Sequence, residues 1–441
     1  MRSSHSLDRL AVSFDDDHAV ANAGLLLPAT LAQHVGLRDL VDAHVDLGEA
    51  PGKANAGDKL LTLVHSALAG GDCIDDADAL RAGGTGAVLG HRVKAPSTLG
   101  TFLRSFSSGH FSQLEVVTGQ LLARAWAVGA GPGAAPFTID LDSTHCETYG
   151  LMKEGGSDHA YTGARGYHPL LAVAAGTGDV LHSRLRNGNS TSSRGAGIFL
   201  TETVNRVRAA GASGELTVRA DSGFYTHAVV AAARKRHVRF SITIRMYAPV
   251  REVIEAIAKD AWTPIPYWID GGADVAETTY TPFASQKDAV PVRLIVRRVQ
   301  RTLGDQLPLF PNYEYHAFIT DRSGETIALE ADHRRHAEIE NAIRDLKYGM
   351  GLNHLPSGKF GANGAWLAVQ VIAHNLARWT ARLGLEAGIV NTKTLRRKFF
   401  DLPGRLTKSA RRFTLRFPTR WPWAVAFAAA LARLRASPLP T

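Results

Sequence analysis

The sequence predicts an α/β protein whose strands form a mixed sheet, and three observations indicate this class. Short apolar runs bounded by turn residues recur between residues 137 and 220, as is typical of strands. The segment 198–209 between them has apolar residues at helical spacing. Strictly alternating apolar positions begin at residue 237. Strands interrupted by a helix in this way favour a sheet that is covered by helices.

Residues 1–135 are predicted to be helical. Apolar residues recur every three or four positions in 25–41 and in 59–68, which is the period of one helix face. Pro96 marks the start of a further helix, because proline is favoured in the first helical turn. The basic stretch 91–106 around it is compatible with a DNA-recognition helix and equally with an ordinary surface helix.

A Gly- and Pro-rich linker at 129–136 separates this helical region from the predicted sheet. A β-rich stretch begins at residue 237, and two long helices follow it. The predicted strands are 137–141, 167–175, 180–185, 216–220, 238–246, 267–269, 278–281, 292–299 and 313–319, and the helices are 198–209, 334–348 and 364–383.

The composition is that of a globular protein. The chain has 441 residues, 45% of them apolar and 21% charged, so at roughly 150 residues per domain we expect two to four units. The longest apolar run, 421–432, contains Pro422 and is shorter than the ~20 residues of a membrane span. Three consecutive aspartates, 15–17, stand where a signal peptide would need an apolar stretch. We therefore expect a cytoplasmic protein with no membrane partner.

The cysteine content limits the kinds of metal site. Cys73 and Cys146 are the only two cysteines and are far apart in the sequence. This spacing argues against a disulfide framework and against a zinc finger built on thiolates. We expect any metal ion to be bound by oxygen or imidazole ligands.

Positive charge is concentrated near the C-terminus. The chain has 50 Lys and Arg residues against 41 Asp and Glu, a net charge of +9. Residues 391–420 contain ten basic residues and one acid, Asp401, so this segment alone accounts for that net charge. Four phenylalanines are interleaved with the charges, which favours contact with a nucleic-acid backbone. The alternative is a solvated tail that aids solubility.

Three carboxylates stand where they could perform chemistry. Asp142 and Asp221 each follow an apolar strand, and Glu340 lies on a helix with Lys347 seven residues, or two turns, further along the same face. Oxygen ligands from separate elements are what a pair of hard divalent cations requires. Asp140 competes with Asp142, because strand alternation places both on one side. Each residue also has a simpler interpretation, as a turn, cap or solvated side chain.

Four motifs together resemble the DDE transposases of bacterial insertion sequences, in particular insertion-sequence family 1380, which is related to family 4. They are DLDST (140–144), RADSGFY (219–225), the Glu340–Lys347 pair and KFGANGAWLAVQVIAHNLARW (359–379). The resemblance covers about residues 137–385. It implies a ribonuclease H-like mixed sheet with a β-rich insertion between the second Asp and the Glu.

The resemblance also implies a division of the chain. Residues 1–135 would form the helical N-terminal region that recognises DNA ends. Residues 136–236 and 316–390 would form the catalytic domain, with 237–315 as the β-rich insertion. Residues 391–441 would form a basic C-terminal segment that contacts DNA.

By the same resemblance, Asp142, Asp221 and Glu340 are the metal-binding triad for two Mg²⁺ or Mn²⁺ ions. Asp140 would support the triad and Lys347 would position the DNA strand. The implied DNA contacts are His336, Arg334, Lys347, Arg396, Arg397, Lys398, Arg411 and Arg412.

The chain departs from the family signature around Glu340. His333 and His336 occupy the Tyr and Arg positions of that signature, so Arg334, Arg335 or a protonated His336 would have to hold the DNA phosphates. One rival is a zinc site made by His333, His336 and Glu340, which share a helix face. Two tryptophans of the insertion, Trp262 and Trp268, are candidates to hold a flipped base, although either is more often a core residue.

The implied activity is metal-dependent cleavage at the terminal inverted repeats of an insertion sequence, followed by strand transfer into target DNA. The partners would be those double-stranded repeats and target DNA, bound by a homodimer that is associated with the nucleoid during action. Two alternatives stay open: a catalytically inactive DNA-binding derivative, and a metal-dependent nuclease without joining activity.

Overall fold

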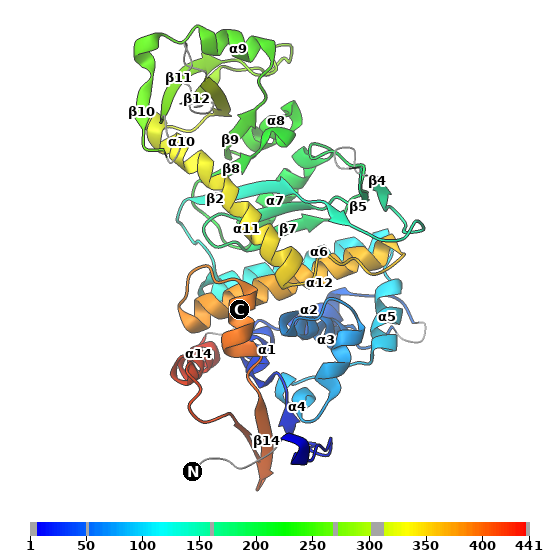
Figure 1. The fold of residues 1–441 in the computed structure, drawn as a ribbon. Helices are drawn as coiled ribbons and strands as arrows, with labels where there is room; N and C mark the ends of the chain where they lie inside the picture. The colour runs from blue at the N-terminus through cyan, green and yellow to red at the C-terminus, as the bar shows by residue number, and fades with distance from the viewer. Residues whose placement is uncertain (1–6, 50–52, 159–162, 268–271, 301–312, 438–441) are drawn as a thin grey trace.

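A nine-stranded mixed sheet forms the centre of the fold (Figure 1). The computed structural model describes residues 7–49, 53–158, 163–267, 272–300 and 313–437. The strand order is β10-β11-β12-β13-β9-β8-β2-β6-β7. These strands are β2 (Phe137–Ser143), β6 (Leu170–Ala174), β7 (Val180–Arg184), β8 (Leu216–Ala220), β9 (Arg239–Ile244), β10 (Thr263–Ile265), β11 (Ala273–Tyr280), β12 (Val292–Gln300) and β13 (Tyr313–Thr320).

Five of the strands have ribonuclease H-like topology. β2, β6 and β7 form an antiparallel meander, and β8 and then β9 add in parallel on the other side of β2. Helix α7 (Ala196–Ala209) leads into β8, and helix α8 (His227–Lys235) connects β8 to β9. The predicted fold class, a mixed α/β sheet of this kind, is confirmed.

The central strands are apolar because both faces of the sheet are covered there. Ile139 and Leu141 of β2 lie opposite Val218 and Ala220 of β8, and all four side chains are fully buried. Two charged residues interrupt this pattern at one level of the sheet, and they pair with each other, as described below.

The β-rich stretch continues the main sheet. β13 pairs antiparallel with β9, from Ala317 opposite Ile244 to Thr320 opposite Ser241. β9 lies within the range predicted as insertion, yet it is the fifth strand of the central topology, so the sheet runs on across residue 237. Strands β10 to β13 also have a small apolar cluster of their own with helix α10 (Thr326–Arg334). The predicted strand at 267–269 lies largely outside the described residues.

The predicted helix 334–348 is part of a longer helical segment, residues 326–349, which we call the rod. Helix α10 continues through a 3-10 turn, Arg335–Glu338, into α11 (Ile339–Arg344) and a π turn, Asp345–Gly349. Helix α12 (Phe360–Trp379) follows and lies between the sheet and the N-terminal helices (Figure 1). Nearly all of its residues are buried, as expected for a helix that is apolar around most of its circumference.

The N-terminal region is helical, as predicted. Gly36 adopts a φ of 65° and divides the single helix expected over 25–41 into two. The helices are α1 (Leu26–His34), α2 (Leu37–His44), α3 (Ala56–Ala69), α4 (Thr85–Leu89), α5 (Pro96–Arg104) and α6 (Phe111–Ala125).

The basic C-terminal segment is folded and packs on the N-terminal helices. Phe400 and Leu402 are buried, and strand β14 (Gly404–Ser409) pairs with the short strand β1 (Ala19–Val20). The described part of the segment is therefore a folded element and not a tail, although most of its basic side chains are exposed. The elements are α13 (Thr392–Leu395), a π turn (Arg396–Phe400), β14 (Gly404–Ser409), β15 (Arg412–Arg416) and α14 (Ala424–Ala436). Among the described residues, no helix combines the length and apolar character needed to cross a membrane.

Candidate active site

Asp142 and Asp221 lie at the same edge of the sheet. β2 and β8 are parallel, with Leu141 opposite Ala220, so the residues that follow each of these stand at one level. Asp142 accepts a hydrogen bond from the Ser143 amide at 2.6 Å, and Asp221 accepts one from the Gly223 amide at 2.9 Å. Each carboxylate is thus oriented by a local backbone amide.

The helical rod follows strand β2 in the same direction. His336 Nδ1 lies 2.9 Å from Asp140 Oδ1. Further along, Lys347 Nζ donates to the backbone oxygen of His145 at 2.8 Å. The rod and strand β2 therefore run in the same direction, with residue numbers increasing the same way along both.

This parallel course brings Glu340 level with Asp142. Four residues of the rod, from His336 to Glu340, rise about 6–8 Å across its 3-10 and α-helical parts, and two residues of strand, from Asp140 to Asp142, rise about 6.6 Å. Glu340 and Asp221 are exposed, whereas Asp142 is half-buried. The least accessible carboxylate therefore stands beside two that are open to an incoming ligand.

The three carboxylates form one electrostatic cluster. Burial is the largest of the effects that raise the pKa of Asp142, and the charges of Asp221 and Glu340 raise it too, while the Ser143 amide and His336 lower it; the net result is a pKa of about 6. Like-charged oxygens crowd together in this way where a cation can neutralise them. The donor set, carboxylate oxygen only, fits a hard divalent ion.

The ligand atoms of this cluster are more widely spaced than in one compact group. In the described ranges, Asp72, Cys73 and Asp76 are the one set of three candidate ligands whose atoms all lie within 4.8 Å of one another. The carboxylates of the predicted triad therefore do not all lie within 4.8 Å of one another. The exposed Asp72–Asp76 set has a different explanation, because Asp76 Oδ2 accepts the amides of Asp72 and Cys73 and the Cys73 thiol.

Asp140 is occupied by a buried ion pair. Arg219 on β8 donates to both of its carboxylate oxygens, at 2.8 and 2.9 Å, and each of the two residues is 1% exposed. Arg219 also contacts Asp332 on the rod at 3.1 Å. Asp140 thereby joins two strands to the helix that carries Glu340, and this geometry separates its role from that of Asp142.

Arg219 is a site residue that the sequence interpretation missed. A signal was present, because an arginine inside the apolar strand LTVRA must find a partner if the strand is buried. Its partner lies 79 residues away in the sequence, so the pairing depends on the strand register.

His333 does not face the carboxylates. Its ring nitrogens lie 2.8 Å from Ser241 Oγ and 2.9 Å from Thr243 Oγ1 of β9, and the ring stacks on Phe318 with centroids 4.0 Å apart. Desolvation lowers its pKa to about 3, so the ring is neutral. Because both nitrogens are engaged, the zinc alternative with His336 and Glu340 is wrong.

Among the predicted DNA contacts, Arg334 and Arg396 have partners within the fold. Arg334 lies 3.0 Å from the buried Glu330. Arg396 donates to the backbone oxygens of Ala67, Leu68 and Gly349 at 2.8–3.0 Å, and burial lowers its pKa. These bonds tie the C-terminal segment to α3 and to the end of the rod, which favours a structural role for Arg396.

The other predicted cations of the C-terminal segment are more accessible. Arg397, Arg411 and Arg412 are exposed, and Lys398 lies over the ring of Trp423 at 5.5 Å. Arg411 and Arg412 belong to the β14–β15 hairpin, at the end of the molecule opposite the insertion (Figure 1). They are therefore remote from the carboxylates.

A cavity of about 420 Å³ opens beside Glu340, between the insertion and the rod. Its lining includes Arg297, His316, Arg334 and His336, so positively charged or protonatable groups surround an approach to the carboxylate cluster. In the insertion, the Arg298 guanidinium lies 4.2 Å from the ring centre of Trp262, and Trp268 lies outside the described residues.

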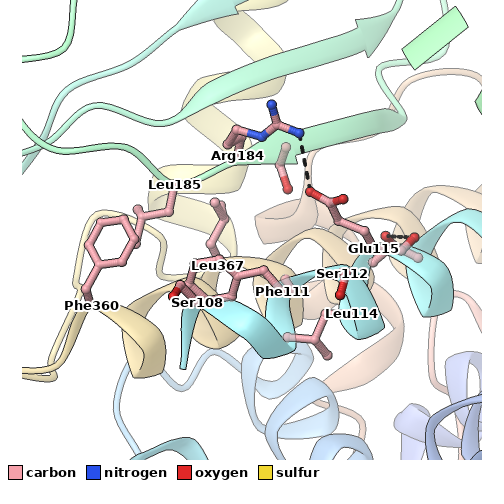
Figure 2. A pocket seen from close by; sticks show the side chains of 13 residues that line it. Ser108, Phe111, Ser112, Leu114, Glu115, Arg184, Leu185, Phe360 and Leu367 are labelled. Atoms are coloured by element: carbon pink, nitrogen blue, oxygen red, sulfur yellow. Dashed lines mark hydrogen bonds and ion pairs between the residues drawn. The ribbon is translucent and has the colours of Figure 1, made fainter. Parts of the chain in front are cut away.

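A second cavity, of about 380 Å³, lies between α6, β7 and α12 (Figure 2). Phe111, Leu185 and Phe360 contribute apolar surface, and Arg184 and Glu115 approach each other to 3.6 Å at its rim. None of the predicted site residues lines it, so it is separate from the carboxylate cluster.

We expect Asp142→Asn to stabilise the metal-free protein at pH 7 by about 1–3 kcal/mol, since one pKa unit corresponds to about 1.4 kcal/mol. The folded-state pKa is raised, so the stability present below the unfolded pKa is lost as pH rises through about 6. Urea unfolding in EDTA at pH 7 and at acidic pH measures this. The gain should vanish at acidic pH, and a destabilised variant at pH 7 would contradict the clustering.

Comparison with known proteins matched a family model and several solved structures. A family model described as transposase DDE domain group 1 matches residues 3–439. The cryo-EM structure of a piggyBac transposase synaptic complex with hairpin DNA is similar at 11% identity and a TM-score of 0.45, covering 86% of this chain and 80% of that one. No curated protein matches the sequence.

Proposed function

This chain belongs to the transposase DDE domain group 1 family, and on that premise we propose that it is a cut-and-paste DNA transposase. It would cut at the terminal inverted repeats of an insertion sequence and transfer the ends into target DNA, acting as a homodimer that brings two ends together. The observation that supports this most is the electrostatic cluster of Asp142, Asp221 and Glu340 at the open edge of the sheet.

The residues that would hold two Mg²⁺ or Mn²⁺ ions are Asp142, Asp221 and Glu340. Asp142 would be central to this set, because the charges of both of the others raise its pKa. When bound, such ions activate the attacking hydroxyl and stabilise charge on the phosphoryl oxygens.

The remaining residues would position the carboxylates and the DNA. The Asp140–Arg219 pair fixes β2 against β8, and His336 joins this pair to the rod one turn before Glu340. The cations beside the cavity, Arg297 and Arg334, would attract DNA phosphates toward Glu340. Their shared partner Glu330 offsets only part of that charge.

Lys347 would hold a phosphate of the cleaved strand. It lies two turns beyond Glu340 and its ammonium group donates to the backbone oxygen of His145 near the end of β2. We expect Lys347→Met to lower the cleavage rate by about 10- to 100-fold, as for the loss of one charged contact to the transition state. Lys235→Met, at an exposed lysine at the end of α8 and outside the cluster, is the control. Equal rates for both variants would remove Lys347 from the site.

Excision from a plasmid tests the proposal as a whole. The plasmid carries the reading frame's flanking inverted repeats, and the purified chain is added with Mg²⁺. We expect double-strand breaks at the repeat ends, and their absence under every divalent metal tried would favour the inactive DNA-binding alternative.

Joining is tested separately with pre-cut ends and a target plasmid. Insertion of the ends is the expected result. Cleavage in the first assay without insertion in the second would identify a nuclease that does not join.

A further inference from the structure

We propose that the β14–β15 hairpin is a groove-binding β-ribbon, a second contact with duplex DNA that is remote from the carboxylates. The identity of the partner, duplex DNA, rests on the proposed function. The face that makes the contact follows from the hairpin itself.

The two faces of the hairpin differ in chemistry. Opposite residues of an antiparallel pair lie on the same face, and successive residues alternate between faces. One face carries the pairs Arg405–Arg416, Thr407–Thr414 and Ser409–Arg412, and the other carries Leu406–Leu415 and Lys408–Phe413. The first face therefore consists entirely of arginine and hydroxyl side chains.

This basic face carries repulsion that a polyanion would relieve. Arg405 and Arg416 stand directly opposite each other, and like charges in that position destabilise a sheet. Among the described residues, the one carboxylate within ion-pair distance is Asp16, 3.6 Å from Arg405 Nε and itself exposed. Arg412 and Arg416 are exposed as well. The excess charge matches a DNA backbone.

The turn places an arginine at the tip in a strained conformation. Ala410 and Arg411 connect the strands with φ angles of 44° and 68°. Positive φ at both central residues is the type I′ geometry that favours Asn-Gly, and neither residue here relieves the strain. Strain of this kind is retained where a side chain has a function, so Arg411 is a candidate contact.

The shape of the hairpin suits a groove. β1 pairs only with Gly404 and Arg405 at its base, so the distal part is a two-stranded ribbon. Such ribbons fit the major groove, which is about 12 Å wide. The hairpin projects from the molecule at the end away from the insertion (Figure 1), where a duplex can reach it.

The first test compares two triple variants by fluorescence anisotropy on a duplex that carries one inverted repeat, over a series of salt concentrations. Arg405→Ser with Arg412→Ser and Arg416→Ser removes the basic face. Lys235→Ser with Arg236→Ser and Arg251→Ser removes the same charge from exposed positions at the end of α8 and on α9 (Ala248–Glu255).

We expect the hairpin variant to bind at least about 10-fold more weakly than the control, with the salt dependence reduced by about two to three counterions. Equal affinity of the two triple variants would overturn the proposal.

A second variant guards against misfolding. Arg411→Gly removes the tip side chain and relieves the positive φ, so the protein should be at least as stable as the wild type while its affinity for the duplex falls about 3- to 10-fold. Unchanged affinity would overturn the role of the tip.

Cleavage of the same duplex is measured in parallel. Binding through the hairpin without cleavage by the wild type would leave this inference standing and count against the transposase proposal. If a hairpin variant binds the duplex like the wild type and also cleaves it, this inference is overturned while the transposase proposal is supported.

Discussion

Asp142→Asn and Asp221→Asn should each lower Mg²⁺-dependent cleavage of end-containing DNA by at least about 10³-fold. Asparagine keeps the shape of the side chain but removes the charge that binds a divalent ion, and the ions supply most of the stabilisation of the phosphoryl transition state. Of the two variants, Asp142→Asn should lower the cleavage rate more, because the charge of Asp142 is coupled to both Asp221 and Glu340. The measurement is the single-turnover rate on a labelled duplex.

The control for this prediction is Glu338→Gln. Glu338 is an exposed carboxylate on the same rod, two residues before Glu340, and it pairs with Arg335 at 3.0 Å. Its loss should leave the rate within about twofold of the wild type, because an exposed pair contributes little. Similar rates for Glu338→Gln and Asp142→Asn would show that the cluster is not the catalytic centre.

Arg219→Leu should destabilise the fold by about 3–5 kcal/mol, because it leaves the carboxylate of Asp140 buried without its partner. The pair is enclosed at the centre of the sheet and each residue is 1% exposed. Urea unfolding measures the free energy. Combining Arg219→Leu with Asp140→Leu should recover most of the loss, since two apolar residues of similar volume can replace a buried pair.

The matched control is Arg239→Leu on the neighbouring strand β9. Arg239 pairs with Glu215 at 3.2 Å, but its side chain is 46% exposed, so we expect a change within about 1 kcal/mol. Equal losses for Arg219→Leu and Arg239→Leu would mean that the Asp140–Arg219 pair does not hold the two strands together.

The central strands could be predicted from the sequence because their signal is local. Residues 137–141 and 216–220 are apolar runs that end at turn residues, and both were found as β2 and β8. Burial on both faces makes such strands apolar along their length. The two aspartates were identified for the same reason, since each directly follows one of these runs.

The alternating pattern predicted strand β9 itself but not its place in the central sheet. Its alternation indicated a strand with one polar face, as in a separate β-rich insertion. In the structure that polar face is covered by the rod, and His333 bonds to Ser241 and Thr243 there. These partners lie about 90 residues apart, so no window of the sequence contains the pairing.

The C-terminal hairpin was missed for a related reason. Its basic residues dominate the composition of 391–420, and this charge obscured the alternation within 404–416. Pairing with β1 near the N-terminus and the burial of Phe400 stabilise the segment. Both contacts join the two ends of the chain, which a sequence pattern does not reveal.

The most direct test of the central claim is the number of Mn²⁺ ions that the protein binds, a measurement that does not depend on the cleavage rate. Electron paramagnetic resonance counts the ions bound by the wild type and by Asp142→Asn, Asp221→Asn and Glu340→Gln, with inverted-repeat DNA present. We expect two ions per chain in the wild type and weaker binding or fewer ions in every variant. Identical stoichiometry and affinity in the wild type and all three variants would contradict a shared metal site.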